Sequence, residues 1–224
     1  MVTEREIVLQ ECKNGVFVAS PTSRAGGSIV YRYHPSPGVV YINATNSCTN
    51  RCTFCVRQFT SGLSGYMLYL KSEPTADELW EALQREIQPT DRQVVWCGFG
   101  EPTTRLNLIL DLTRKIKEKY PHVQIRLDTD GQAQLRYKSR NVAKELKEAG
   151  VGVVSISLNA ENEEKYDALC NPAYPGAYKA LLEFAKECKK HSLAVRLSVV
   201  GSTDANIQEC KKIADEFNCE FVVR

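Results

Sequence analysis

From residue 39 onward, short apolar segments alternate with longer segments whose apolar residues recur at helical spacing. This alternation is typical of a parallel sheet covered by helices, because consecutive parallel strands need a crossover connection that is usually a helix. The segments that we predict as strands are residues 39–45, 93–99, 123–128, 152–159, 194–200 and 219–223.

The number of these units favours an incomplete barrel. Six strands within about 186 residues give roughly 31 residues per strand–helix unit, which matches the usual βαβ spacing. A closed eightfold barrel usually takes ~250 residues. We therefore predict an α/β fold, a partial (β/α)6 TIM-type barrel with parallel strands, open on one side. A doubly wound open sheet is the structural alternative.

Residues 1–38 do not follow this rhythm. Residues 7–10 and 16–19 flank Lys13-Asn14-Gly15, which predicts a short N-terminal β-hairpin, and residues 20–27 have the composition of a loop. We therefore predict an N-terminal extension at residues 1–38 and a barrel at residues 39–224.

Local signals predict several helix ends. Thr75 and Glu78 form a capping box at the start of the first helix. Gly150 is placed to end the third helix, and Asp204 is placed to cap the last one.

Polar residues share one face on three of the predicted strands, since side chains alternate between faces along a strand. These residues are Arg126, Asp128 and Asp130, then Ser155, Ser157 and Asn159, then Arg196 and Ser198. Closed barrels usually fill their interior with branched apolar side chains, so a polar lining favours a cofactor cavity. The alternative is a buried salt-bridge network between Arg126, Asp128 and Arg196.

Charge and composition exclude several classes of partner. The net charge is +2, with 29 basic and 27 acidic residues interspersed, so we expect no nucleic-acid partner. No apolar run reaches the ~20 residues of a membrane span, and the polar start of the chain does not resemble a signal peptide. We expect a cytoplasmic protein without membrane contact, whose high number of cysteines, nine, indicates metal binding or redox chemistry rather than disulfides.

Three of the cysteines directly follow the first predicted strand as Cys48-x3-Cys52-x2-Cys55. A [4Fe–4S] cluster held by four thiolates is coordinatively complete and suits electron transfer. Three thiolates leave one iron open, as a catalytic metal requires. A zinc site is the alternative, but zinc sites usually pair two ligand arms and no second arm is evident. The other six cysteines have no ligand-like spacing, and we interpret them as packing residues, with an auxiliary cluster as the alternative.

The triad with Phe54 before its last cysteine resembles the signature of the radical SAM superfamily. Gly98-Phe99-Gly100-Glu101-Pro102, after the second strand, resembles the "GGEP" element of that superfamily. The resemblance implies that Cys48, Cys52 and Cys55 hold a [4Fe–4S] cluster and that S-adenosylmethionine binds its open iron. It also implies that the backbone of this element and Glu101 meet the amino group of the cofactor.

Three further segments are similar to superfamily elements in the same order. Residues 128–131 resemble a "TNG" strand end in which Asp130 replaces the usual Asn. Residues 155–159 resemble a segment where Ser157 and Asn159 would meet the cofactor's ribose or carboxylate. Residues 197–201, with Val200, resemble the segment that flanks adenine. In detail the chain looks most like the TatD-associated radical SAM proteins.

The resemblance implies an enzyme whose cluster reductively cleaves S-adenosylmethionine to methionine and a 5′-deoxyadenosyl radical, which abstracts hydrogen from an unknown substrate. An electron donor such as flavodoxin or ferredoxin would be its partner. The alternative is a non-catalytic iron–sulfur redox sensor or electron carrier. Within the superfamily, a 7-carboxy-7-deazaguanine synthase-like or glycyl-radical activating enzyme stays open. We interpret Arg57 in the loop after the triad, and the loop at residues 170–176, as connectors, with substrate contact as the alternative.

Overall fold

A computed structural model describes residues 8–12, 16–20, 27–33 and 36–224 of the chain. Its centre is a seven-stranded sheet with the order β12-β11-β10-β9-β8-β4-β3. The strands are β3 (Val30–Tyr31), β4 (Val39–Ile42), β8 (Gln93–Trp96), β9 (Gln124–Thr129), β10 (Val151–Ser157), β11 (Ala194–Val199) and β12 (Glu220–Val223). All neighbours in the sheet run parallel except β3, which pairs antiparallel with β4.

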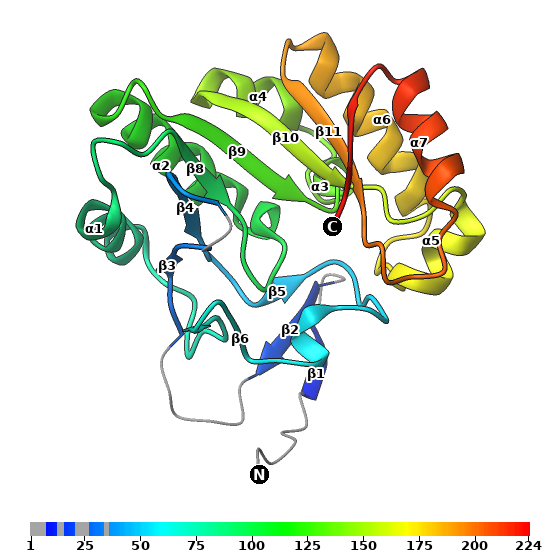
Figure 1. The fold of residues 1–224 in the computed structure, drawn as a ribbon, viewed down its shortest axis with the longest axis horizontal. Coiled ribbons are helices and arrows are strands. Elements are labelled where there is room, and N and C mark those ends of the chain that lie inside the picture. The colour runs from blue at the N-terminus through cyan, green and yellow to red at the C-terminus, as the bar shows by residue number, and fades with distance from the viewer. Residues whose placement is uncertain (1–7, 13–15, 21–26, 34–35) are drawn as a thin grey trace.

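The six predicted strands are all present as β4, β8, β9, β10, β11 and β12, in sequence order across the sheet. The sheet does not close on itself, because β12 and β3 lie at its two edges (Figure 1). The predicted α/β fold with an open, partial barrel is therefore confirmed. The edge strand β3 was not predicted, since a two-residue strand has no measurable alternation.

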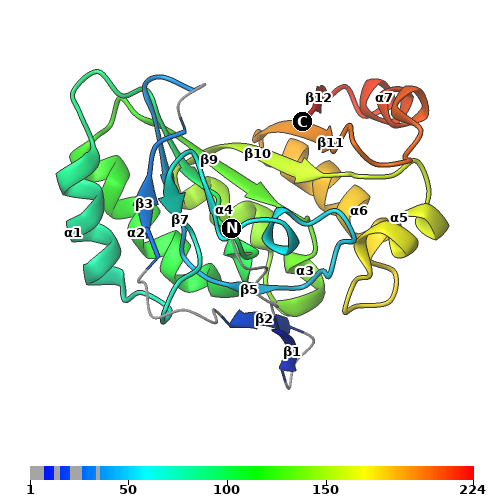
Figure 2. The same cartoon turned by 60° about the horizontal axis from the view of Figure 1, so that its bottom comes forward.

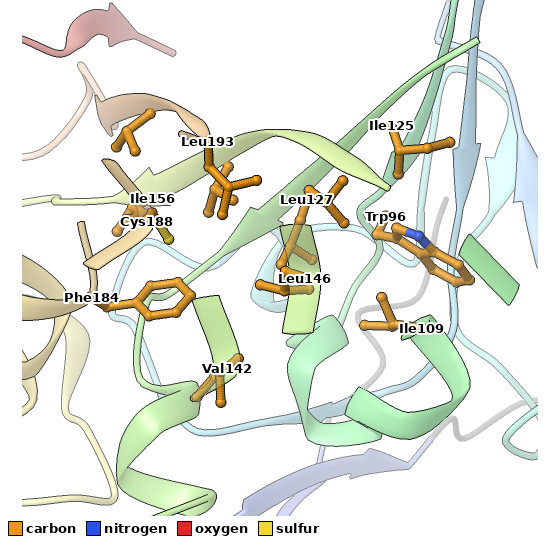
Figure 3. Packing of buried hydrophobic residues seen from close by; sticks show 14 of the residues in the cluster. Trp96, Ile109, Ile125, Leu127, Val142, Leu146, Ile156, Phe184, Cys188 and Leu193 are labelled. Atoms are coloured by element: carbon orange, nitrogen blue, oxygen red, sulfur yellow. The ribbon is translucent and has the colours of Figure 1, made fainter. Parts of the chain in front are cut away.

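The helices pack against one face of this sheet. They are α1 (Ala76–Glu86), α2 (Leu106–Lys119), α3 (Ala133–Arg136), α4 (Val142–Ala149), α5 (Glu163–Cys170), α6 (Ala177–Lys190) and α7 (Ile207–Glu216). Buried helical residues such as Ile109, Leu146 and Phe184 share a single core with Leu127 and Ile156 of the strands (Figure 3).

The opposite face carries a separate cluster of Tyr31, Tyr41, Val95 and Phe99 of the sheet and its loops, covered by Leu68 and Tyr69. A doubly wound sheet would have helices on both faces, so the alternative fold is wrong.

The helix ends follow the predicted local signals with one exception. Thr75 and Glu78 form the capping box of α1, and Gly150 ends α4 in the left-handed region with φ +105°. The cap of α7 is Asn206, whose side chain accepts from the Glu209 amide, so the prediction of Asp204 is wrong. Asp204 lies two residues before the cap and instead pairs with Lys165.

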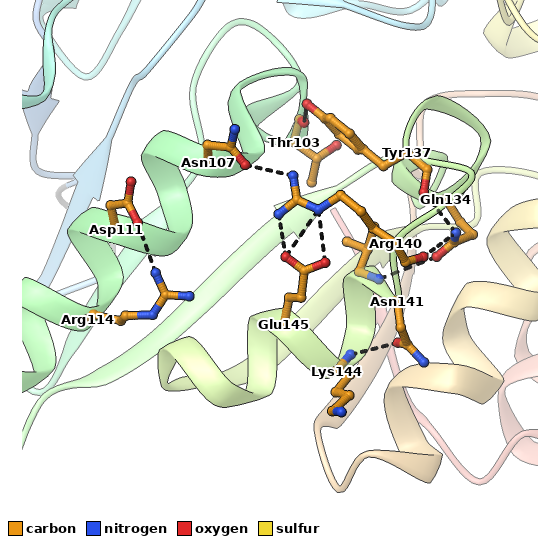
Figure 4. Close-up of polar contacts among 11 residues, drawn as sticks. Thr103, Asn107, Asp111, Arg114, Gln134, Tyr137, Arg140, Asn141, Lys144 and Glu145 are labelled. Atoms are coloured by element: carbon orange, nitrogen blue, oxygen red, sulfur yellow. Dashed lines mark hydrogen bonds and ion pairs between the residues drawn. The ribbon is translucent and has the colours of Figure 1, made fainter.

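Polar contacts hold the segment after β8 against the one after β9 (Figure 4). Arg140 donates from Nε to Glu145 at 2.9 Å and from Nη1 to Asn107 of α2 at 2.6 Å. The Tyr137 hydroxyl donates to the Thr103 carbonyl at 3.0 Å. Thr103 belongs to the short 3-10 helix η2 (Pro102–Arg105), so these contacts fix the chain directly after Glu101.

The N-terminal strands β1 (Val8–Cys12) and β2 (Val16–Ser20) pair antiparallel, which confirms the predicted hairpin. The predicted turn at residues 13–15 and most of the predicted loop at residues 20–27 lie outside the described residues. Strand β2 also pairs with β5 (Ser47–Cys48), with Phe17 opposite Cys48. Figures 1 and 2 both place the hairpin beside β5, away from the helices. No described helix is long and apolar enough to cross a membrane.

Candidate functional site

The loop that carries the three predicted ligands begins at the carboxyl end of β4 and is clamped against the end of α5. The amide of Arg51 donates to the Cys170 carbonyl at 3.0 Å, and that of Thr53 to the Leu169 carbonyl at 2.9 Å. The Thr49 carbonyl accepts from the Ala173 amide at 2.8 Å. These contacts hold the loop against the carboxyl end of α5 and the residues just after it.

Cys48, Cys52 and Cys55 are half-buried free thiols that lie within electrostatic reach of one another. A hydrogen bond with Cys170, followed by burial, raises the pKa of Cys52, and the charges of Cys48 and Cys55 act in the same direction. Burial raises the pKa of Cys48 to about 12. The structure brings the predicted triad together and adds a fourth thiol, Cys170, which is fully buried.

A shared iron–sulfur cluster needs these thiols as thiolates aimed at one centre. Within residues 27–33 and 36–224, no three His, Cys, Asp or Glu side chains are already arranged as a metal site. The donor set of three neighbouring thiols fits a cluster with one open iron, and its side chains would have to reorient to bind it.

Arg57 provides a positive charge beside these thiols. Arg57 is 2 % exposed, and its guanidinium donates from Nε to Cys55 Sγ at 3.3 Å and from Nη1 to the Asn46 carbonyl at 2.9 Å. Burial lowers the pKa of Arg57, but the thiols of Cys48 and Cys55 raise it, and the net change is upward. The sequence predicted a connector here, because nothing local indicates that this loop arginine turns inward.

Gly98 and Gly100 lie where the chain passes very close to the start of the cysteine loop. A Cβ atom on Gly98 would meet Asn43 Oδ1 at 2.0 Å, and one on Gly100 would meet the Ser47 carbonyl oxygen at 2.4 Å. The Phe99 amide donates to the same Asn43 oxygen at 3.2 Å. The superfamily resemblance implies that the backbone of this element closely approaches the amino group of a cofactor. In the structure the approach is to the chain's own segment before the triad.

Glu101 and Asp130 join the carboxyl ends of β8 and β9. Glu101 Oε2 accepts from the Asp130 amide at 2.7 Å, and its Oε1 accepts from the hydroxyls of Thr103 and Thr129 at 2.7 and 2.8 Å. The Thr49 hydroxyl donates to Asp130 Oδ2. The two carboxyl groups therefore connect both strand ends to the cysteine loop.

Burying two carboxyl groups together disfavours their charged forms. Burial, followed by the charge of Asp130, raises the pKa of Glu101 well above its usual range. Burial also raises the pKa of Asp130, although its hydrogen bonds with Thr49 and the Gln132 amide oppose the change.

Two buried carbonyl oxygens at this site have no hydrogen-bond donor among the described residues. They are Oε1 of Gln132, which is 1 % exposed, and Oδ1 of Asn159, which is 3 % exposed. Gln132 Nε2 donates to Asn50 Oδ1 at 2.7 Å, and Asn159 Nδ2 contacts Cys170 Sγ at 3.5 Å. Buried acceptors are normally satisfied, so both oxygens fit a ligand that supplies N–H or O–H groups.

Asn159 was predicted as a site residue, whereas Gln132 was missed. The signal that could have indicated Gln132 is its place directly after the Asp128–Gly131 element, at the carboxyl end of a strand.

The remaining predicted contact residues are Phe54, Ser157 and Val200. Phe54 is half-buried against the main core and lines a cavity of about 490 Å³ with Val56, Phe59 and Leu169.

Ser157 Oγ accepts from Arg224 Nη2 at 3.0 Å, and half-buried Val200 directly follows β11.

The polar strand face forms two separate ion pairs instead of the network proposed as an alternative. Arg126 pairs with Asp128 at 2.8 Å, whereas Arg196 pairs with Glu220 of β12 at 3.0 Å. Arg196 and Glu220 are register partners on neighbouring strands, which explains their preference for each other.

A family model described as "Radical SAM superfamily" matches residues 42–217. The chain is 28 % identical over 177 residues to a probable GTP 3′,8-cyclase of Thermococcus kodakarensis, covering 77 % of this chain and 52 % of that protein. It is 32 % identical over 127 residues to a 7,8-dihydro-6-hydroxymethylpterin dimethyltransferase of Methanocaldococcus jannaschii, covering 56 % and 23 %. The chain thus spans about half or less of the length of these curated relatives.

Two solved structures share the fold at 13 % sequence identity. One is methylornithine synthase (PylB), with a TM-score of 0.58 over 82 % of this chain and 52 % of that one. The other is TYW1 with a lysine-pyruvate adduct bound, with a TM-score of 0.52 over 83 % and 64 %. At this identity the likeness concerns the fold alone.

Proposed function

The chain belongs to the radical SAM superfamily, whose members use a [4Fe–4S] cluster and S-adenosylmethionine, and we propose that it is an enzyme acting on a substrate still to be identified. When bound, the cluster and cofactor supply reductive cleavage to methionine and a 5′-deoxyadenosyl radical that abstracts hydrogen from the substrate. The protein binds, orients and shields the reacting groups.

One observation carries this proposal. Three thiols of a single loop lie beside two buried carbonyl oxygens that lack a donor among the residues the structure describes, Gln132 Oε1 and Asn159 Oδ1. Asn159 Nδ2 contacts Cys170, and Cys170 in turn contacts Cys52 of the triad. Cys170 therefore connects Asn159 to the cysteine triad. A pure electron carrier needs no unsatisfied acceptors beside its cluster, so this arrangement favours an enzyme over a non-catalytic sensor.

Each group has a distinct role in the proposed site. Cys48, Cys52 and Cys55 bind three irons and leave the fourth open. Gln132 and Asn159 accept hydrogen bonds from the cofactor's amino or hydroxyl groups.

The further proposed contacts to the cofactor are those expected from the superfamily resemblance: Phe54, Gly98, Phe99, Gly100, Glu101, Asp130, Ser157 and Val200.

The identity of the subgroup and substrate is part of the proposal. The relatives reported above include GTP 3′,8-cyclases, and the resemblance to TatD-associated radical SAM proteins rests on sequence motifs alone. A 7-carboxy-7-deazaguanine synthase-like or glycyl-radical activating role belongs to the same set of candidates. Deuterium transfer from labelled candidate substrates into 5′-deoxyadenosine distinguishes among them.

We also propose a flavodoxin or ferredoxin as electron donor and the cytoplasm as the location. Supporting this, the cysteines whose side chains the structure describes are all free thiols, which suits a reducing compartment.

Electron paramagnetic resonance on anaerobically reconstituted, dithionite-reduced protein tests the proposal. We expect a [4Fe–4S]⁺ signal that changes when S-adenosylmethionine is added, together with formation of 5′-deoxyadenosine. A cluster signal that ignores the cofactor would favour the carrier, and bound zinc without iron would overturn the proposal.

A further inference from the structure

We infer that Arg57 raises the reduction potential of the cluster, by placing a buried and permanent positive charge against the thiolate of Cys55. The inference rests on the proposed function, since it requires the cluster to be bound by the triad.

The position of Arg57 is fixed from two sides. Its Nη1 donates to the Asn46 carbonyl at 2.9 Å, and its own carbonyl accepts from the Tyr69 hydroxyl at 3.0 Å. These contacts leave Nε directed at Cys55 Sγ, 3.3 Å away. An N–H donor to a ligand sulfur is one of the protein groups that tune iron–sulfur potentials.

The charge of Arg57 has no carboxylate partner in the part of the chain that the structure describes. The ion pairs found there use other arginines, among them Arg32, Arg105, Arg126 and Arg140. A buried charge without a counter-charge is costly, and a guanidinium does not lose its proton to escape that cost. The guanidinium instead faces Cys55 Sγ at 3.3 Å, so the balancing negative charge belongs to the cluster.

Reduction of the cluster strengthens its electrostatic attraction to Arg57. A [4Fe–4S]²⁺ core with three thiolates carries one negative charge, and one electron from the donor gives a [4Fe–4S]⁺ core and a second negative charge. A nearby buried cation attracts the second state more strongly than the first, because charges interact more strongly away from water. Arg57 therefore makes the cluster easier to reduce.

The test is a potentiometric titration monitored by electron paramagnetic resonance, without S-adenosylmethionine, on reconstituted wild-type protein and three variants. Arg57→Gln removes the charge, and Arg57→Lys keeps it. Arg114→Gln is the matched control, because Arg114 is an exposed residue of α2 paired with Asp111. We expect the ratio of reduced to oxidised cluster in Arg57→Gln to be about tenfold lower than in wild type at the wild-type midpoint potential, one tenfold step in the equilibrium constant. Arg57→Lys and Arg114→Gln should titrate like wild type.

The outcomes distinguish failure of the inference about Arg57 from failure of the proposed function. An Arg57→Gln variant with full iron content and an unchanged midpoint would overturn the inference and leave the proposed function intact. If Arg57→Gln holds no iron, Arg57→Lys decides: a wild-type midpoint supports the role of the charge, and a lowered midpoint refutes it. Wild-type protein that binds no cluster would overturn the proposed function and this inference together.

Discussion

The backbone amide of Asp130 donates to Glu101 Oε2 at 2.7 Å, which places the carboxyl groups of Glu101 and Asp130 near each other at the ends of neighbouring strands. Both are almost fully buried, and among the described residues neither accepts a hydrogen bond from an arginine or lysine side chain. The protein therefore holds protons at this site that the unfolded chain releases.

The first prediction concerns stability against pH. The pKa of Glu101 is raised from 4.5 to about 8, so between these values the folded state binds a proton that the unfolded state has lost. The free energy of unfolding should consequently fall as pH rises through this window. Asp130→Asn removes one buried charge, and we expect it to stabilise the apoprotein on the order of 2 kcal/mol at pH 8.

Urea unfolding of the apoprotein at pH 5 and pH 8 measures this effect. Asp111→Asn, at an exposed position on α2, is the matched control and should leave the pH dependence unchanged. Equal pH dependence in wild type and Asp130→Asn would contradict the prediction.

The second prediction separates cluster ligands from a neighbouring thiol. Replacing Cys48, Cys52 or Cys55 by Ala should each abolish stable iron binding after reconstitution, since the cluster needs all three thiolates. Cys170→Ala should keep the iron, although removing a fully buried sulfur destabilises the fold by about 1–2 kcal/mol. Iron and sulfide analysis checks both. Loss of iron from Cys170→Ala, in protein that remains folded, would show that the fourth thiol is also a ligand.

The third prediction compares two glycines, one without room for a Cβ atom and one with room for it. Gly98→Ala would place a Cβ 2.0 Å from Asn43 Oδ1, whereas the nearest atom to a Cβ on Gly152 is 3.5 Å away. We expect Gly98→Ala to lower the free energy of unfolding by about 3 kcal/mol, because overpacking forces the backbone to move. Gly152→Ala should change it by less than about 1 kcal/mol. Similar unfolding curves for the two variants would refute the close approach.

The fourth prediction separates backbone strain from side-chain function at Asn159, which has φ +57°. Asn159→Gly tolerates this conformation, so its stability should stay within about 1 kcal/mol of wild type, whereas Asn159→Ala should lose a further 1–2 kcal/mol, roughly. Both variants lack the buried acceptor, and both should bind S-adenosylmethionine about tenfold more weakly to the reconstituted protein. Equilibrium dialysis measures the affinity; a wild-type value for Asn159→Gly would remove Asn159 from the site.

Much of the fold was predictable because its signals are local. The strand segments, the capping box at Thr75 and the left-handed end at Gly150 each depend on a few adjacent residues. The missed strand β3 and the cap at Asn206 depend on tertiary context: β3 exists only because β4 offers it an edge, and Lys165 engages Asp204.

Of the candidate site, only the sequence motifs could be predicted from the sequence. The spacing of the cysteines indicated a cluster, but not that Cys170 would lie beside Cys52, since that contact joins segments far apart in the chain. The burial of Arg57 and the missing donor on Gln132 are likewise properties of packing and have no sequence signature.

The pairing of β2 with β5 also affects the order in which these segments can dock during synthesis. A chain is synthesised from its N-terminus, so the residues of β2 leave the ribosome well before those of β5. The hairpin can close on itself early, because its two strands are adjacent, but Phe17 has no strand to pair with until Cys48 has been made. The hairpin is therefore synthesised before the strand it docks against, and it can settle there only after the start of the cysteine loop has been made.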